Sequence, residues 1–417
     1  MRLFKKFMYK KSFTRHFSSK GGRNSSHFGY GAKSGGQNRR GRSGRNNSRS
    51  ERIDPSRFIN KIVLTEEIEH FTPEHKFQDF HIDEKLKRAI VSKGYDLPTP
   101  IQDRTISHIL QGTDLVGIAN TGTGKTAAFL IPLINKILQN RKEKILIVVP
   151  TRELAIQIEE EFKRFTKEMK MFSVCCVGGA NINRQIHDLR YEYNFIMGTP
   201  GRLKDLINRR MILLKEFNTI VLDEADRMLD MGFINDMRFV VAGMPKERQT
   251  LFFAATLSRE IEGLIGEFLK NPVRISVKTG DTAKNVEQDI IRVGQSSAKT
   301  DILYDLLNQK EFSKVLVFGR TKHGVEKLSE TLTKMGIKTE SIHGNKNHFK
   351  RQKALNLFKT NRVQVLVATD VAARGLDIPD VSHVINYDMP ATHDDYAHRI
   401  GRTGRGNKRG KALTFIE

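Results

Sequence analysis

Three carboxylates follow a short apolar run in the sequence "TIVLDEAD", residues 219–226. The run is β-prone, and Asp223, Glu224 and Asp226 come directly after it. A parallel strand delivers its last residues to the carboxyl edge of its sheet, where ligands bind. We predict that Asp223 is a Mg²⁺ partner acting through water, and that Glu224 orients or deprotonates an attacking water. The alternative is a solvated acidic turn at a strand end.

A second segment, "ANTGTGKT" (119–126), predicts a phosphate-binding loop between a strand and a helix. Backbone N–H groups near its glycines can cradle phosphate oxygens, Lys125 can reach the β- and γ-phosphates, and Thr126 can ligate Mg²⁺. The strict pattern has Gly at the position of Ala119, and the alternative is a structural glycine turn. The predicted nucleotide-binding residues of the loop are Thr121, Gly122, Thr123, Gly124, Lys125 and Thr126.

Short apolar runs that alternate with amphipathic segments position these residues. The runs predict strands at 114–119, 144–150, 172–177, 194–199, 219–224, 249–255, 314–319, 338–344, 364–369, 382–388 and 411–417. Helical segments such as 124–139 and 152–169 separate them, and this alternation is typical of parallel α/β sheets. The polar stretch 278–285 predicts a linker, so we expect two consecutive α/β domains.

The chain is strongly basic, with 417 residues and a formal net charge of +24. Residues 1–50 hold 14 Lys and Arg and no Asp or Glu, and Gly, Ser, Asn and Arg dominate from residue 21. Such a segment buries little and is typical of disorder. Its arginines, with Phe28 and Tyr30 between them, favour a nucleic-acid-binding arm. The alternatives are a solubilising tail and, for the first twenty residues, a mitochondrial presequence.

The only two cysteines, Cys175 and Cys176, are adjacent in an apolar run and predict two small residues in a strand. Unpaired cysteines fit a reducing compartment, so we expect a cytoplasmic protein. No apolar run approaches the ~18 residues of a transmembrane helix, so we expect no membrane partner.

Together these motifs resemble those of the DEAD-box RNA helicases of superfamily 2, whose name matches residues 223–226. The resemblance runs from Phe77 to Glu417. It implies two RecA-like parallel-sheet domains in tandem behind a disordered basic N-terminal tail. The expected boundaries are 1–60 for the tail, 61–280 for the first domain and 281–417 for the second.

The resemblance also implies roles for residues of the first domain. "GYDLPTPIQ" (94–102) resembles a motif that reads adenine through Gln102, and Phe77 matches the isolated aromatic upstream of that motif. "PTRELA", the Gly178–Gly179 pair and "TPGR" resemble RNA-backbone motifs. The RNA-contact residues expected there are Thr151, Arg152, Gly179, Thr199, Gly201 and Arg202. A helix cap is the alternative role of the "TRE" segment.

In the second domain, three segments resemble family motifs IV, V and VI: "VFGRTK" (317–322), "ATDVAARGLDIP" (368–379) and "HRIGRTGR" (398–405). The RNA-contact residues expected there are Arg320, Arg351 and Thr369. Asp377 is expected near the ribose. Arg402 and Arg405 are expected on one helix face as a γ-phosphate clamp. The residues expected to couple the ATP site to the domain interface are Asp226, Ala254, Thr256 and His398.

Three departures from the family pattern bear on function. Ala254 stands where the family has Ser, and one lost hydrogen bond costs about 1 kcal/mol, so we expect retained ATPase with weakened unwinding. His348 stands where the family has Gln, although Arg351 is kept. The family usually continues beyond the position of Glu417 with another helix, so we expect a truncated chain.

The resemblance implies an RNA-stimulated ATPase that closes its two domains on ATP, Mg²⁺ and RNA and locally unwinds RNA duplexes. RNA sequence should matter little because the expected contacts are to phosphates and sugars. We expect a monomer and no obligate protein partner. The alternatives are an ATP-gated RNA clamp, favoured by Ala254 and the tail, and an RNA chaperone that acts through the tail with weak unwinding. A DNA translocase is disfavoured by the adenine-reading motif and the "DEAD" sequence.

Overall fold

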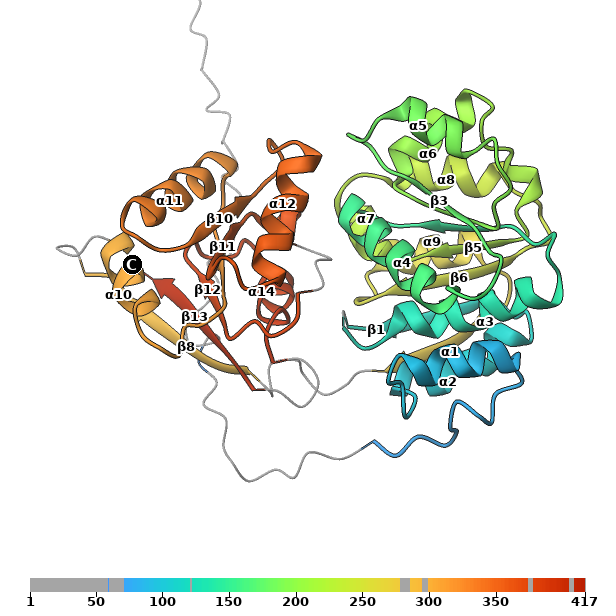
Figure 1. The fold of residues 1–417 in the computed structure, drawn as a ribbon, viewed down its shortest axis with the longest axis horizontal. Helices are drawn as coiled ribbons and strands as arrows, with labels where there is room; N and C mark the ends of the chain where they lie inside the picture. Colours follow the sequence, from blue (N-terminus) through green and yellow to red (C-terminus); the bar gives the residue numbers. More distant parts are fainter. Residues whose placement is uncertain are drawn as a thin grey trace, which may run out of the picture. The chain divides into compact units, whose positions relative to one another are not determined.

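A computed structural model describes Ile59 and residues 71–120, 122–277, 286–294, 299–373, 378–404 and 409–416. The described residues contain two parallel β-sheets, each with helices on both faces (Figure 1). This confirms the predicted α/β class with two parallel sheets. The predicted tail, the linker at 278–285 and the boundaries at residues 60 and 280 lie outside the described residues.

The first sheet has seven strands in the order β3-β4-β2-β5-β6-β1-β7, and every pairing is parallel. Its strands are β1 (Leu115–Ala119), β2 (Ile145–Val148), β3 (Ser173–Cys176), β4 (Phe195–Gly198), β5 (Thr219–Leu222), β6 (Gln249–Ala254) and β7 (Val273–Val277). Its helices are α1 (Glu84–Ser92), α2 (Pro100–Leu110), α3 (Lys125–Gln139), α4 (Arg152–Phe165), α5 (Ile182–Asp188), α6 (Pro200–Asn208), the 3₁₀ helix η2 (Leu214–Glu216), α7 (Ala225–Asp230), α8 (Ile234–Gly243) and α9 (Arg259–Phe268).

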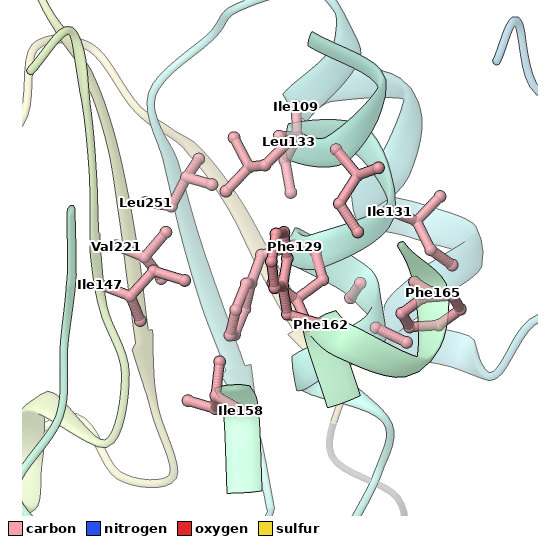
Figure 2. Close-up of a cluster of buried hydrophobic side chains, with 14 of the residues drawn as sticks. Ile109, Phe129, Ile131, Leu133, Ile147, Ile158, Phe162, Phe165, Val221 and Leu251 are labelled. Atoms are coloured by element: carbon pink, nitrogen blue, oxygen red, sulfur yellow. The ribbon is translucent and has the colours of Figure 1, made fainter. Parts of the chain in front are cut away.

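Alternating side chains of these strands build two separate cores, one on each face of the sheet. Ile147, Val221 and Leu251 point toward α2, α3 and α4, where they meet Phe129 and Phe162 (Figure 2). Their neighbours along the strands point the other way, onto α6, α7, α8 and α9. Because both faces are covered, the central strands are buried along their whole length, which explains their uninterrupted apolar sequences.

The second sheet has six parallel strands in the order β10-β11-β9-β12-β13-β8. Its strands are β8 (Val286–Arg292), β9 (Val315–Phe318), β10 (Thr339–Ile342), β11 (Val365–Ala368), β12 (His383–Asn386) and β13 (Gly410–Ile416). Its helices are α10 (Lys299–Leu307), α11 (Lys322–Lys334), α12 (His348–Lys359), α13 (Asp370–Ala373) and α14 (His393–Ile400). One core contains α10 and α11 and the other contains α12, α13 and α14.

Every predicted strand is present, with ends that differ by one or two residues. Strands β7 and β8 were not predicted; they lie at sheet edges and alternate between buried and exposed residues. Such strands lack the continuous apolar run on which the predictions depended. Cys175 and Cys176 lie in β3, as predicted, and both are free thiols. No helix among the described residues is long and apolar enough to cross a membrane.

Candidate functional site

The predicted phosphate loop connects the buried end of β1 to the start of α3. Gly122 and Gly124 adopt φ values of +84° and +94°, a conformation that glycine reaches without strain. Lys125 is 6% exposed, and its Nζ donates a 2.8 Å hydrogen bond to the carbonyl oxygen of Ala119. The Thr123 hydroxyl donates to the carbonyl oxygen of Asn120. The described residues of the loop therefore follow a strand–turn–helix path, and the N-terminus of a helix in this position favours an anion.

Gln102 ties α2 to this loop. Its Oε1 accepts a 3.0 Å hydrogen bond from the Thr99 backbone N–H, and its Nε2 donates a 3.1 Å bond to the carbonyl oxygen of Gly124. A Cβ atom added at Gly124 would lie 2.5 Å from Nε2, so the close approach requires glycine. Gln102 is 1% exposed, so the side chain expected to read adenine is also part of the buried framework.

Phe77 lies within the hydrophobic core rather than open to solvent. Its ring is 2% exposed and makes edge contacts with the rings of Phe80 and Tyr95, at centroid distances of 6.3 and 6.1 Å. This packing gives Phe77 a structural role that the sequence analysis did not anticipate. Its contact with adenine stays a prediction.

The acidic residues lie directly beyond β5, at the edge of the sheet that also carries the phosphate loop. Asp223 Oδ1 accepts a hydrogen bond from the Glu224 backbone N–H at 3.0 Å. Burial raises the pKa of Asp223 to about 6, partly opposed by the nearby Lys125 ammonium. A buried carboxylate in this position favours the approach of further positive charge.

Glu224 is held in a strained backbone conformation, with φ at +53°. Its Oε2 accepts a 3.0 Å hydrogen bond from Arg227 Nη1. Burial alone would raise the pKa of Glu224, but the charges of Arg227 and Lys125 outweigh it and hold this pKa below its usual range. The ionised form of Glu224 is therefore favoured, and Arg227 fixes its orientation.

Asp226 connects these acids to the end of β6. Its Oδ2 accepts hydrogen bonds from the backbone N–H groups of Ala255 and Thr256, at 2.9 and 3.0 Å, and from the Thr256 hydroxyl at 3.2 Å. The side chain of Ala254 instead lies fully buried in the core, opposite Ile118 of β1. The predicted coupling residues Asp226 and Thr256 are thus in contact.

The residues expected to bind RNA on the first sheet gather around the glycine pair. The Arg152 guanidinium lies across Gly178 and Gly179, where a Cβ at Gly179 would collide with it. Arg202 Nη1 donates a 2.8 Å hydrogen bond to Gln185 Oε1. Thr151 caps α4 through its hydroxyl, which confirms the helix-cap role of this segment.

Other predicted RNA-contact residues lie at the carboxyl ends of strands. Thr199 is the N-cap of α6, and Gly201 is exposed in its first turn. Arg320 is exposed immediately after β9, and Thr369 follows β11. Arg351, on α12, is partly buried, and its Nη2 lies 2.9 Å from Glu153 Oε1.

The prediction that Arg402 and Arg405 share one helix face is wrong. Helix α14 ends at Ile400, and Arg402 follows in a turn. Gly404 adopts φ +64°, which no helix accommodates. Arg402 is 3% exposed, and its Nε donates to the carbonyl oxygen of His398 at 3.2 Å. Thr121, Asp377 and Arg405 lie outside the described residues.

Arg399 is an organising residue that the sequence analysis missed. Its guanidinium binds both carboxylate oxygens of Asp370, at 2.6 and 2.8 Å, and also Asn386 Oδ1 and the carbonyl oxygen of Asp388. It also lies over the Phe318 ring, 5.1 Å from the centroid. The available signal was its position between the buried Tyr396 and Ile400 on α14, because an arginine on a buried helix face requires an acidic partner.

Comparisons with known proteins agree with this geometry. Residues 99–264 match the DEAD/DEAH box helicase family, and residues 298–407 match the helicase conserved C-terminal domain. The chain is 46% identical over 342 residues to the DEAD-box ATP-dependent RNA helicase CshA of Bacillus subtilis, covering 82% of this chain and 69% of that protein. It is 45% identical over 344 residues to the ATP-dependent RNA helicase CshA of Listeria monocytogenes, covering 82% of this chain and 66% of that protein. The chain therefore spans about two thirds of the length of these relatives.

Solved structures show the same similarity. Dbp5 of S. cerevisiae, bound to RNA and ADP BeF3, is 28% identical with a TM-score of 0.73, over 82% of this chain and 89% of that chain. The DEAD-box helicase Mss116, bound to ssRNA and UDP-BeF, is also 28% identical with a TM-score of 0.74, over 83% of this chain and 76% of that chain.

Proposed function

Because the chain belongs to the DEAD/DEAH box helicase family, we propose that it is an ATP-dependent RNA helicase. In this proposal the protein hydrolyses ATP to ADP and phosphate, and RNA stimulates the reaction. ATP and RNA bind together, the two domains close, and local strands of an RNA duplex separate. Phosphate release reopens the protein.

The proposal is carried by one arrangement: the predicted phosphate loop and the acidic cluster occupy the same edge of the first sheet. Lys125 is close enough to Asp223 and Glu224 to influence the pKa of both. We assign Lys125 to the β- and γ-phosphates and Glu224 to the attacking water, since Glu224 is ionised and fixed by Arg227. Gln102 is assigned to the adenine, which favours ATP over other nucleotides.

Asp223 and Thr126 are the residues that fit a Mg²⁺ ion. Asp223 is 2% exposed, and burial raises its pKa to about 6, so a cation nearby would stabilise its ionised form. Thr126, whose hydroxyl would bind the ion, is the residue after Lys125 in the first turn of α3. Bound Mg²⁺ would neutralise charge on the phosphate oxygens while retaining most of its water ligands.

The basic side chains at the sheet edges are assigned to the RNA backbone. Arg152, Arg202 and Arg320 follow strands or begin helices, where backbone N–H groups also favour phosphate. Arg402, which follows α14 in the second domain, is assigned to the γ-phosphate as an arginine finger. The hydrogen bonds from Ala255 and Thr256 to Asp226 would couple the position of the acidic cluster to that of the segment that follows β6.

A second candidate function, an ATP-gated RNA clamp with little unwinding, is favoured by Ala254. This side chain has no hydroxyl and lies in an apolar core, so it contributes no hydrogen bond to the Asp226 network. A clamp would hydrolyse ATP and hold RNA without separating strands. Strand displacement under single-turnover conditions distinguishes the two functions.

The test is the rate of ATP hydrolysis without nucleic acid, with single-stranded RNA and with DNA of the same sequence. We expect stimulation by RNA alone, and loss of hydrolysis in Glu224→Gln. Glu192→Gln, which changes an exposed residue, serves as the matched control and should behave as the wild type. Absence of RNA stimulation in the wild type would refute the proposed coupling and favour an RNA chaperone.

A further inference from the structure

Phe349 is the most exposed large apolar side chain in the described part of the chain, at 76%. It is the second residue of α12, whose buried face is formed by Ala354, Leu355 and Phe358 on the other side of the helix. A single exposed apolar residue is ordinary on a protein surface. Two features distinguish Phe349: it lies in the first turn of α12, and exposed lysines lie near it.

The strand order β10-β11-β9 places the segments of Phe349, Thr369 and Arg320 in a row, and the last two residues are predicted RNA contacts. Because these strands are parallel, the segments that follow them all lie at the carboxyl edge of the sheet. Arg320 follows β9, Thr369 follows β11, and Phe349 follows β10 after a short loop. An RNA strand lying over Arg320 and Thr369 would therefore meet the start of α12 next.

Two hydrogen bonds show that these segments are close neighbours. The Thr369 backbone N–H donates to the carbonyl oxygen of Ile342, the last residue of β10, at 3.3 Å. Lys322, at the start of α11, donates from Nζ to Asn345 Oδ1 at 3.1 Å, in the loop that leads to α12. The edge is thus a continuous surface from the Arg320 segment to the Phe349 segment.

The surface around Phe349 is basic. Lys350 and Lys353 are both exposed, and Lys353 lies one helical turn beyond Phe349 on the same face. Lys322 is also exposed along the same edge. An aromatic ring beside such cations suits a single-stranded polyanion whose bases are free to stack, since the ring binds a base face and the ammonium groups bind phosphates.

We propose that Phe349 is a base-stacking platform for one nucleotide of single-stranded RNA, beyond the nucleotides that are expected to contact Arg320 and Thr369. Lys350 and Lys353 hold the adjoining phosphates. This inference rests on the proposed RNA-binding function and adds a contact to a base face, whereas the other assigned contacts are to the backbone. Stacking accepts any base, so the platform extends the bound strand without making recognition sequence-specific.

The test uses the full chain, a non-hydrolysable ATP analogue and single-stranded RNAs that carry 2-aminopurine at one position each. In the wild type, stacking should quench the emission of one position near an end of the bound strand. In Phe349→Ala, that position should regain emission and affinity should fall about tenfold, whereas Phe349→Tyr should retain both. Lys353→Ala should lower the salt dependence of binding by about 0.7 in slope, whereas Phe349→Ala should leave the slope unchanged.

Phe172→Ala is the matched control, because Phe172 is 56% exposed and lies next to the amino end of β3 in the first sheet. It should bind RNA as the wild type does. If the wild type binds RNA with RNA-stimulated ATPase, but Phe349→Ala shows equal affinity and no position regains emission, the platform is refuted and Phe349 fits a protein contact instead. If the wild type neither binds RNA nor responds to it, the proposed function itself fails.

Discussion

Gln102 and Gly124 are joined by a 3.1 Å hydrogen bond from the side-chain amide to the backbone carbonyl, and the amide leaves no room for a Cβ at residue 124. The segment expected to read adenine and the loop expected to hold phosphate are therefore one structural unit. A change in either should alter the binding of the whole nucleotide.

Gly124→Ala should weaken ATP binding by tenfold or more, because the new methyl group displaces Gln102 and strains a residue with φ at +94°. Titration with a fluorescent ATP analogue measures the effect. Gly336→Ala is a close control, since Gly336 has φ +95° with no atom within 4 Å of an added Cβ. Equal affinities of the two variants would show that the contact with Gln102 does not matter.

Ala254→Ser should increase duplex unwinding relative to ATP hydrolysis, if the missing hydroxyl limits coupling between the Asp226 network and the domain interface. The structure sets an opposing cost, because the new hydroxyl would lie in an apolar core, and an unsatisfied buried hydroxyl costs about 1–3 kcal/mol. The measurement is the number of strands displaced per ATP hydrolysed. A variant that unwinds no better than the wild type would count against a coupling defect at residue 254.

Arg399→Met should destabilise the second sheet by about 2 kcal/mol, because it removes the charge-assisted hydrogen bonds of the buried guanidinium to the partly exposed Asp370. Hydrogen exchange of the β11 and β12 amides reports this change locally. The double variant Arg399→Met/Asp370→Asn should recover part of the loss, since the partly buried carboxylate of Asp370 is then no longer left without its partner. Arg362→Met, at an exposed position, is the control. Additive effects of the two substitutions would contradict the pairing.

His383→Phe should reduce the pH dependence of stability between about pH 4 and pH 6.5. His383 is 3% exposed and stacks on Phe312 at a centroid distance of 4.0 Å, and burial lowers its pKa to about 4. Between the folded and unfolded pKa values of His383, the unfolded chain binds more protons at this residue than the folded protein does. The stability that the folded protein has with a neutral His383 is therefore fully present above the unfolded pKa, and it is lost as the pH falls through this window. Phenylalanine keeps the ring stack and removes the titration.

The measurement for His383→Phe is the thermal unfolding midpoint at pH 5 and at pH 7.5, each compared with the wild type. The variant should lose less stability than the wild type on acidification. His323→Phe, at an exposed histidine, should follow the wild type. An unchanged difference between the two pH values in His383→Phe would exclude His383 as a source of acid sensitivity.

Deletion of residues 1–52 should make RNA binding less dependent on salt, because this segment contributes 15 Lys and Arg and one Glu. The measurement is the slope of log affinity against log salt for single-stranded RNA. Basal ATP hydrolysis without RNA provides the control, since the deletion leaves the predicted phosphate loop intact. An unchanged slope would show that the segment does not contact RNA.

The sequence predicted most of this fold because the central strands are buried on both faces and therefore carry continuous apolar runs. It also predicted that Asp223 and the phosphate loop share one edge, which follows from the parallel arrangement alone. It could not predict β7 and β8, whose alternating pattern depends on their edge positions.

The details of the candidate site were harder to predict from sequence. Helix α14 ends before Arg402, with Gly401 as its C-cap, and the spacing of the two arginines carries no information about that end. The burial of Phe77 depends partly on Tyr95, and the contacts of Arg399 include Asp370 and Phe318, which lie in other elements of the fold. Motif spacing carries no information about such tertiary partners.

The strand order of the first sheet also has a consequence for how the protein is made. β1 is buried along its whole length, yet its two neighbours are β6 and β7, with Leu115 facing Leu251 and Val273. While the ribosome synthesises the intervening residues, β1 has an apolar surface and no strand partners. Such non-local pairing slows folding and exposes aggregation-prone surface, so the nascent chain should depend on chaperones until β7 has emerged.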